Sequence, residues 1–432
     1  MDLINPQKKE SKQKGTTMKT IRRNDQIINE KDRDNGIENV DTRVALIQAL
    51  IPVALQSVNE MLQQQVEQLV GPRYGRQKDE ERENYRWGQQ SGSVYLGEQK
   101  IPVSVPRVRN LTTGKEVTLE SYKKLQTPTE LDEKLLLKVL YGLSCHQYEK
   151  VALSVPESFG LSASTTSRRF IKASARKLKD LQKRRLEKYD FVSIILDGKS
   201  LAEEQVLIVV GVTVDGQKVI LGFEQTATEN AKVTRQFLQS LIDRGLAYQQ
   251  GLLVVIDGSK GLRKAIDEVF GDYAAVQRCQ WHKRENVVAY LSKSEQTRFR
   301  SKLQQAYEQP TYGQASKALK SIRAELKLIN ESAVRSLDEG LEETLTLHRL
   351  GVFQELGISL KTTNCLESIN SQVARFTGRV TYWKNSNQRQ RWLASTLLEI
   401  EKRLRKIKGY RHLPTLRKAL QRELNIQNIM AA

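Results

Sequence analysis

Three acidic residues stand where a folded chain could bring them together. Asp197 ends the run Phe-Val-Ser-Ile-Ile-Leu-Asp-Gly, Asp257 ends Gly-Leu-Leu-Val-Val-Ile-Asp-Gly, and Glu367 lies in Thr-Asn-Cys-Leu-Glu-Ser-Ile-Asn. Both aspartates follow an apolar, β-branched run that stops at a glycine, which is typical of a buried strand carrying an acid to the edge of a sheet. One Asp-Gly after a strand is also common turn chemistry, so the prediction depends on the repetition.

The chemistry that suits these acids is metal-dependent. Carboxylates held close together repel one another unless a cation neutralises them, and hard divalent cations prefer oxygen ligands. A pair of such ions can activate one oxygen and stabilise another in an in-line displacement at phosphorus. The three acids therefore indicate a metal-binding site for phosphodiester cleavage.

The elements around the aspartates predict a mixed α/β sheet. Strands are predicted over 191–197, 205–214, 217–225, 251–257 and 274–278, and helices over 229–244 and after Gly261. Asp215-Gly216 is a hairpin signal between two of the strands. This order matches a ribonuclease H-like fold, in which Asp197 and Asp257 end neighbouring strands. Residues 284–360 carry no strong strand pattern and are predicted to be an all-helical insertion before Glu367.

The region before the sheet is predicted to be mainly helical, with one small β-hairpin. Residues 1–40 are polar and indicate a flexible tail. A helix from Asp41 to near Val70, kinked at Pro52, has an apolar face for docking or dimerisation, so we expect a homodimer or higher oligomer. The hairpin pairs 94–96 with 101–105 and leads into the basic residues Arg107 and Arg109. It would either read DNA or support a neighbouring domain.

A helix-turn-helix is predicted near Phe159-Gly-Leu-Ser, where a glycine closes one helix and Ser162 caps the next. The second helix would present groups able to bond phosphates or base edges, namely Ser164, Thr165, Arg168 and Arg169. An ordinary helical hairpin is the alternative. Beyond Glu367, Arg375 and Arg379 lie on a helix along which a nucleic-acid backbone could run.

The charge balance favours a nucleic-acid partner. The chain of 432 residues has a net charge of +20, which suits neutralisation of a phosphate backbone and disfavours a small-metabolite enzyme. Three widely spaced cysteines indicate a reducing cytoplasm, and the apolar runs are shorter than the roughly 20 residues of a membrane span. We expect a cytoplasmic protein, nucleoid-associated when bound to DNA. Asp257-Gly-Ser-Lys-Gly lacks the spacing of a phosphate-binding loop, so no nucleotide site is predicted.

Cys279-Gln-Trp-His282 follows the fifth strand and could be half of a zinc site, but no second matching pair of ligands exists, so no zinc is expected. Two strand-end aspartates, this Cys-x-x-His, a helical insertion and a Glu in Thr-Asn-x-x-Glu together resemble the Mutator-like family of DDE transposases of bacterial insertion sequences. The resemblance covers roughly residues 85–408. Tyr85-Arg-Trp-Gly only loosely follows the family's pattern at the start of the hairpin.

The resemblance implies that Asp197, Asp257 and Glu367 are catalytic and bind two Mg²⁺ or Mn²⁺ ions, with His282 beside them. The protein would cut the ends of an insertion sequence and join the 3′-ends to target DNA; its partner would be double-stranded DNA, as terminal inverted repeats and as target. A catalytically silent, domesticated DNA-binding protein and a ribonuclease H-like nuclease without strand transfer are the alternatives.

The expected organisation has six parts: a tail (1–40), a helix and hairpin region (41–128), a helix-turn-helix-like DNA-binding region (129–188), the first part of the catalytic core (189–283), the helical insertion (284–360), and the C-terminal helices of the core with Glu367 (361–432).

Overall fold

The computed structural model describes residues 52–74, 83–96, 99–126, 129–144, 162–201, 204–226 and 231–426. They form two compact units, a smaller one that ends at Gln126 and a larger one that contains the elements after it. The predicted tail and the beginning of the helix predicted from Asp41 lie outside the described residues. So does the first half of the predicted helix-turn-helix.

The smaller unit packs a helix over residues 52–70 on a three-stranded sheet, followed by α2 (Glu120–Gln126). The strands are β1 (Asn84–Leu96), β2 (Gln99–Asn110) and β3 (Glu116–Val117), in that order. Val58, Leu62 and Val66 of the helix share a core with Val94 and Val105 of the sheet. The predicted hairpin is present, but both strands are longer than predicted. The middle of β1, over residues 87–91, is exposed, so its pairing carries no local apolar pattern.

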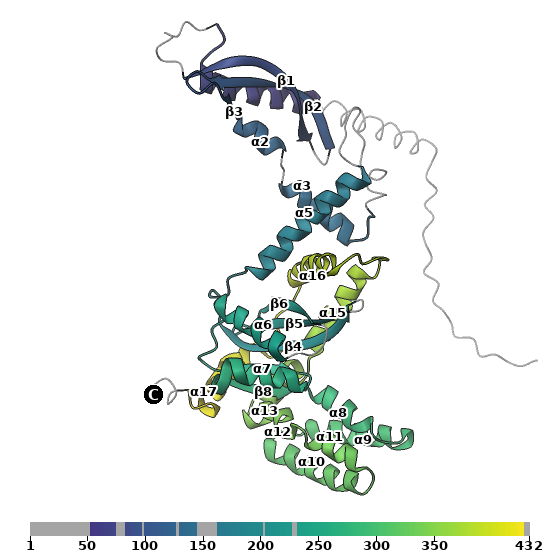
Figure 1. The fold of residues 1–432 in the computed structure, drawn as a ribbon. Helices are drawn as coiled ribbons and strands as arrows, with labels where there is room; N and C mark the ends of the chain where they lie inside the picture. The colour runs from purple at the N-terminus through teal and green to yellow at the C-terminus, as the bar shows by residue number, and fades with distance from the viewer. Residues whose placement is uncertain are drawn as a thin grey trace, which may run out of the picture. The chain divides into compact units, whose positions relative to one another are not determined.

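The larger unit is built on a five-stranded mixed sheet (Figure 1). Its strands are β4 (Phe191–Leu201), β5 (Glu204–Thr213), β6 (Lys218–Thr226), β7 (Leu252–Ile256) and β8 (Ala274–Arg278). The strand order is β6-β5-β4-β7-β8. β5 pairs antiparallel with both β4 and β6, whereas β4 pairs parallel with β7 and β7 parallel with β8. The predicted mixed α/β architecture is therefore confirmed.

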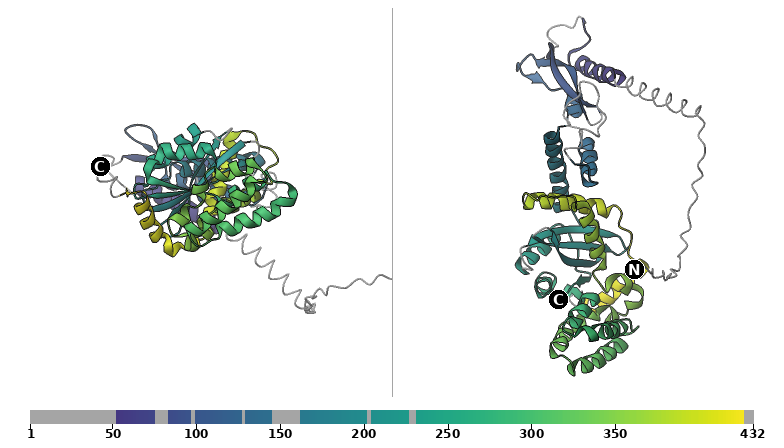
Figure 2. Two further views of the ribbon diagram at one scale, coloured as in Figure 1. Left: turned by 90° about the horizontal axis from the view of Figure 1, so that it is seen from below. Right: turned by 90° about the vertical axis from the view of Figure 1, so that its right-hand side faces the viewer.

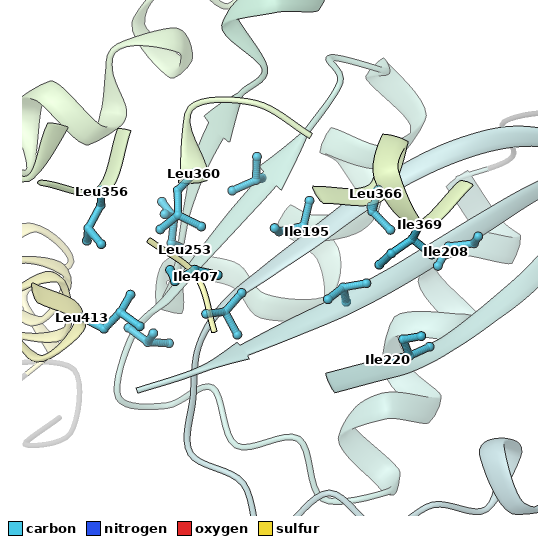
Figure 3. Close-up of a cluster of buried hydrophobic side chains, with 14 of the residues drawn as sticks. Ile195, Ile208, Ile220, Leu253, Leu356, Leu360, Leu366, Ile369, Ile407 and Leu413 are labelled. Atoms are coloured by element: carbon cyan, nitrogen blue, oxygen red, sulfur yellow. The ribbon is translucent and has the colours of Figure 1, made fainter. Parts of the chain in front are cut away.

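Helices cover both faces of this sheet, because its central strands are apolar on both sides. One face, including Ile194 and Leu196, packs on α6 (Ala231–Asp243) and α7 (Lys260–Phe270). The other face packs on α14 (Phe353–Leu360), α15 (Asn364–Thr377), α16 (Ser386–Glu401) and α17 (Leu413–Glu423). Figure 3 shows Leu366 and Ile369 of α15 beside Ile208 of the sheet.

Between β8 and α14 the chain is helical, as predicted for the insertion. The helices are α8 (Gln280–Val288), α9 (Lys293–Tyr307), α10 (Tyr312–Lys327), α11 (Glu331–Asp338), α12 (Leu341–Thr344) and α13 (Thr346–Arg349). Helices α8 to α11 share a separate core around Phe299 and Tyr307, and form a cluster next to the sheet (Figure 2). The side chain of Gln277 in β8 donates to the carbonyl of Thr344, which ties α12 to the sheet.

Among the described residues of the larger unit, α3 (Thr129–Leu140) and α5 (Ala163–Gln182) precede the sheet. The predicted start of the second helix is confirmed, because Ser162 caps α5 by accepting a hydrogen bond from the backbone N–H of Thr165. Leu135, Leu136 and Phe170 bury the contact between α3 and α5. No helix among the described residues is long and apolar enough to cross a membrane.

Candidate active site

Strand register brings the two aspartates together. Ser193, Ile194 and Ile195 of β4 pair with Leu253, Val254 and Val255 of β7. Extending this register by two residues places Asp197 opposite Asp257, since the carboxyl ends of parallel strands meet at one edge of a sheet. Asp197 is only 7% exposed. Asp257 follows β7 directly and accepts a hydrogen bond from the backbone N–H of Ser259, the cap of α7, at 3.1 Å.

Glu367 comes from the first turn of α15, on the face of the sheet opposite α6 and α7. Leu366 and Ile369, on either side of it in the sequence, are fully buried against the sheet. This packing fixes the helix while the Glu367 side chain stays 44% exposed. The apolar spacing of α15 therefore holds the glutamate at the rim of the core, open to a ligand.

Helix α8 adds His282 to the two aspartates and the glutamate. The backbone N–H of Cys279 donates to the carbonyl of Ile256 at the end of β7, and that of Gln280 donates to the carbonyl of Lys361 just before α15. One turn later, His282 Nε2 lies 4.0 Å from Glu367 Oε1. The start of α8 is thus fixed to the two segments that carry Asp257 and Glu367.

The four groups act on one another electrostatically. Burial raises the pKa of Asp197 to about 7, with further contributions from the nearby Asp257 and, to a lesser extent, Glu367. The positive charge of His282 acts in the opposite direction. Hydrogen bonding with Cys279 raises the pKa of His282 to about 9 against the effect of burial, and Asp197 and Asp257 add to the rise. Burial opposes ionisation of the Cys279 thiol, but hydrogen bonding with His282 leaves its pKa lowered.

The donor chemistry of the acids fits a hard divalent cation, because three carboxylates offer oxygen ligands and the raised pKa of Asp197 reflects negative charge that a cation would relieve. Among the described residues, no group of three or more histidines, cysteines or acids is already close enough together to hold a metal ion. Glu367 keeps 44% of its side chain exposed beside His282.

Thr363 is a site residue that the sequence reasoning missed. Its side chain is fully buried, and its hydroxyl lies 3.8 Å from Cys279 Sγ and 3.5 Å from His282 Nδ1. It therefore orients both members of the Cys-x-x-His motif. The available signal was its position in Thr-Asn-x-x-Glu, four residues before Glu367.

The residues predicted to contact DNA on α5 fall into two groups. Ser164 and Arg168 are exposed on the first turns of the helix, and Thr165 is half-buried beside the cap. Arg169 is 9% exposed, and its Nε lies 3.0 Å from Asp132 Oδ1 of α3. Arg169 therefore joins α5 to α3. DNA contact by Ser164, Thr165 and Arg168 stays a prediction.

The remaining basic candidates differ in how accessible they are. On β2, Arg107 forms a two-point ion pair with Glu116 of β3, and Arg109 lies 4.1 Å over the ring of Trp87. On α15, Arg375 is exposed and belongs to the same helix as Glu367. Arg379, also exposed, follows α15 and donates to the carbonyl of Tyr141.

The chain has clear relatives. Residues 26–406 match the family model described as "Transposase, Mutator family". The transposase for insertion sequence element IS905 of Lactococcus lactis subsp. lactis is 25% identical over 69% of this chain and 75% of that protein. The transposase for ISRM5 of Rhizobium meliloti is 27% identical over 83% of this chain and 89% of its own length. The transposase for IS256 in transposon Tn4001 of Staphylococcus aureus is 25% identical over 75% and 83%.

Proposed function

The chain belongs to the Mutator family of transposases, and from this premise we propose that it cuts the ends of an insertion sequence and joins the freed 3′-ends to target DNA by metal-dependent transesterification. Water attacks the phosphorus at the element end, and the bond to the 3′-oxygen breaks. The resulting 3′-hydroxyl attacks a phosphodiester of the target, whose own 3′-oxygen leaves. The second step breaks one phosphodiester bond and forms another, so no nucleotide is required as an energy source.

The observation that carries this proposal is the shared environment of the acids. Asp257 and Glu367 both raise the pKa of Asp197, although the three residues come from a strand, a strand end and a helix far apart in the sequence. Convergence of acids from such distant segments is characteristic of a functional site. The order β6-β5-β4-β7-β8, with β4 in the middle, supports a ribonuclease H-like core.

We assign Asp197, Asp257 and Glu367 as the residues that would hold Mg²⁺ or Mn²⁺. When bound, such ions supply Lewis-acid polarisation of the phosphate and neutralise charge on the attacking and leaving oxygens. His282, cationic because of its raised pKa, would balance the charge of Glu367 and orient it. Double-stranded DNA is the proposed substrate, with the exposed Arg168 and Arg375 among the backbone contacts.

Single isosteric variants test the assignment. Asp197→Asn, Asp257→Asn and Glu367→Gln should each abolish cleavage of DNA that carries the element ends, while gel-shift affinity for the same DNA stays close to wild type. The matched control is Asp272→Asn, which changes an exposed acid in the segment before β8 and should cut normally. Substantial cutting by any one of the three variants removes that residue from the site.

A further inference from the structure

A small pocket lies between β4, β5 and the helices α15 and α16, and it shares β4 with Asp197 and α15 with Glu367. It has a volume of about 80 Å³. Its walls are mostly apolar, with Leu201, Val206, Ile208, Val373 and Leu393 among the lining residues. The pocket shares its elements with the acids, since Lys199 on its rim follows Asp197 by two residues and Asn370 follows Glu367 by one helical turn.

Asn370 is one of the polar residues that line this pocket, with Lys199, Ser200 and Thr377. The residue is only 6% exposed, yet its Oδ1 has no hydrogen-bond partner among the described residues. A buried amide oxygen without a partner is unfavourable, and a ligand with a hydrogen-bond donor would satisfy it. Lys199 is held at the rim, where its Nζ donates to the backbone carbonyl of Asn370 at 3.0 Å.

Two residues that line the pocket share a face of the sheet with Asp197. Asp197, Lys199 and Leu201 alternate along β4, so their side chains lie on the same face, and Lys199 and Leu201 line the pocket. A chain with a phosphate near Asp197 could therefore direct a neighbouring group along this face into the pocket. A group that fits the pocket must have apolar faces that pack on its aliphatic walls and a polar edge that bonds to the carboxamide of Asn370.

A nucleobase has this combination of surfaces, and a side-chain amide pairs with a base edge through one donor and one acceptor. We propose that the pocket receives the edge of one unpaired nucleobase, next to the phosphate that is cut, and that Asn370 holds it. The inference rests on the proposed function, because it takes DNA as the substrate. A base reaches such a pocket only after it has left the duplex stack.

The test uses the full-length chain and duplexes of the element end, each with 2-aminopurine at one position near the cut. In magnesium-free buffer, with binding followed by gel shift, fluorescence should rise at one position because that base is unstacked. Asn370→Leu, which keeps the side-chain size but removes the hydrogen bonds, should abolish the rise and, after magnesium is added, slow cutting about tenfold, the effect of one base-edge contact. Gln372→Ala, on the exposed side of α15, is the matched control and should behave as wild type.

Flat fluorescence at every position, in wild-type complexes that cut when magnesium is added, would overturn the pocket assignment while leaving the proposed function intact. The wild-type measurement decides this even if Asn370→Leu fails to fold. Failure of the wild type to cut any end DNA would instead contradict the proposed function. Binding of free adenosine or cytidine, together with flat fluorescence from DNA, would give the pocket to a free nucleoside and also overturn the inference.

Discussion

Asp197 combines burial with negative neighbours, and both disfavour its charged form. Its pKa is raised to about 7 by burial first and by Asp257 next. The folded chain therefore holds an acid that is costly to ionise unless a cation is present. Such a cost is acceptable at the cation site that we propose, since removal of the acid would then stabilise the fold and abolish the chemistry.

The cost of ionising Asp197 predicts that Asp197→Asn stabilises the metal-free protein at high pH. A carboxyl whose pKa is higher in the folded state contributes stability below its unfolded pKa of 3.8 and loses it as the pH rises through about 7. In metal-free buffer at pH 8, the variant should therefore unfold at a higher temperature than wild type, by an amount worth at most roughly 4 kcal/mol. Thermal unfolding at pH 8 and pH 4 measures this. If wild type and variant are equally stable at pH 8, the ionised Asp197 does not destabilise the folded protein.

His282 offers a second prediction at this scale. His282→Gln removes the positive charge 4.0 Å from Glu367, so cleavage should fall about 10- to 100-fold, the usual effect of losing a residue that orients a metal ligand. The fold should persist, because His282 is partly exposed. His412→Gln, at an exposed position, is the control.

Metal analysis of the purified wild-type protein belongs with this experiment. We expect no stoichiometric zinc, because the Cys-x-x-His of Cys279 and His282 lacks a second ligand pair in the sequence. One zinc per chain, or a His282→Gln variant that cuts at the wild-type rate, would contradict the role given to this residue.

At the scale of elements, α5 combines a structural and a candidate binding role. Arg168 is exposed, whereas Arg169 is buried against Asp132. Arg168→Ala should weaken DNA binding without lowering the melting temperature. Arg169→Ala should destabilise the protein by roughly 1–3 kcal/mol, because it leaves the partly buried carboxylate of Asp132 without its partner.

Equilibrium unfolding and competition binding against matched and scrambled ends separate these outcomes. Arg335→Ala, an exposed arginine on α11, is the control for loss of positive charge. If both α5 variants bind DNA like wild type, recognition belongs to another part of the chain.

The elements also explain which features could be predicted from sequence. The strands that carry Asp197 and Asp257 were predictable, because an apolar run ending in Asp-Gly is a local signal. The cap at Ser162 was local as well. The pairing of Arg169 with Asp132 was not predictable, since it joins residues on two helices 37 positions apart. The contacts of Thr363 with Cys279 and His282 depend in the same way on tertiary packing. The end of β1 at 94–96 was predictable from its own sequence, whereas its extension back to Asn84 comes from pairing with β2.

For the whole molecule, the net charge of +20 predicts binding dominated by phosphate contacts. The affinity for random duplex DNA should fall steeply with salt, roughly a thousandfold between about 50 and 200 mM if some six phosphates are contacted. Fluorescence anisotropy over a salt series gives the slope. An affinity that barely changes with salt would mean that the basic surface does not bind the DNA backbone.

The most direct test of the proposed function is a strand-transfer reaction with the full-length protein. DNA carrying the ends of the parent element is incubated with a target plasmid and magnesium, and the products are mapped at nucleotide resolution. We predict 3′-hydroxyl ends at the element termini and then covalent joints between those ends and target DNA, both absent with Asp197→Asn, Asp257→Asn and Glu367→Gln. Cut ends that are never joined would indicate a nuclease without strand transfer, and intact DNA with the wild-type protein would indicate a DNA-binding protein without this activity.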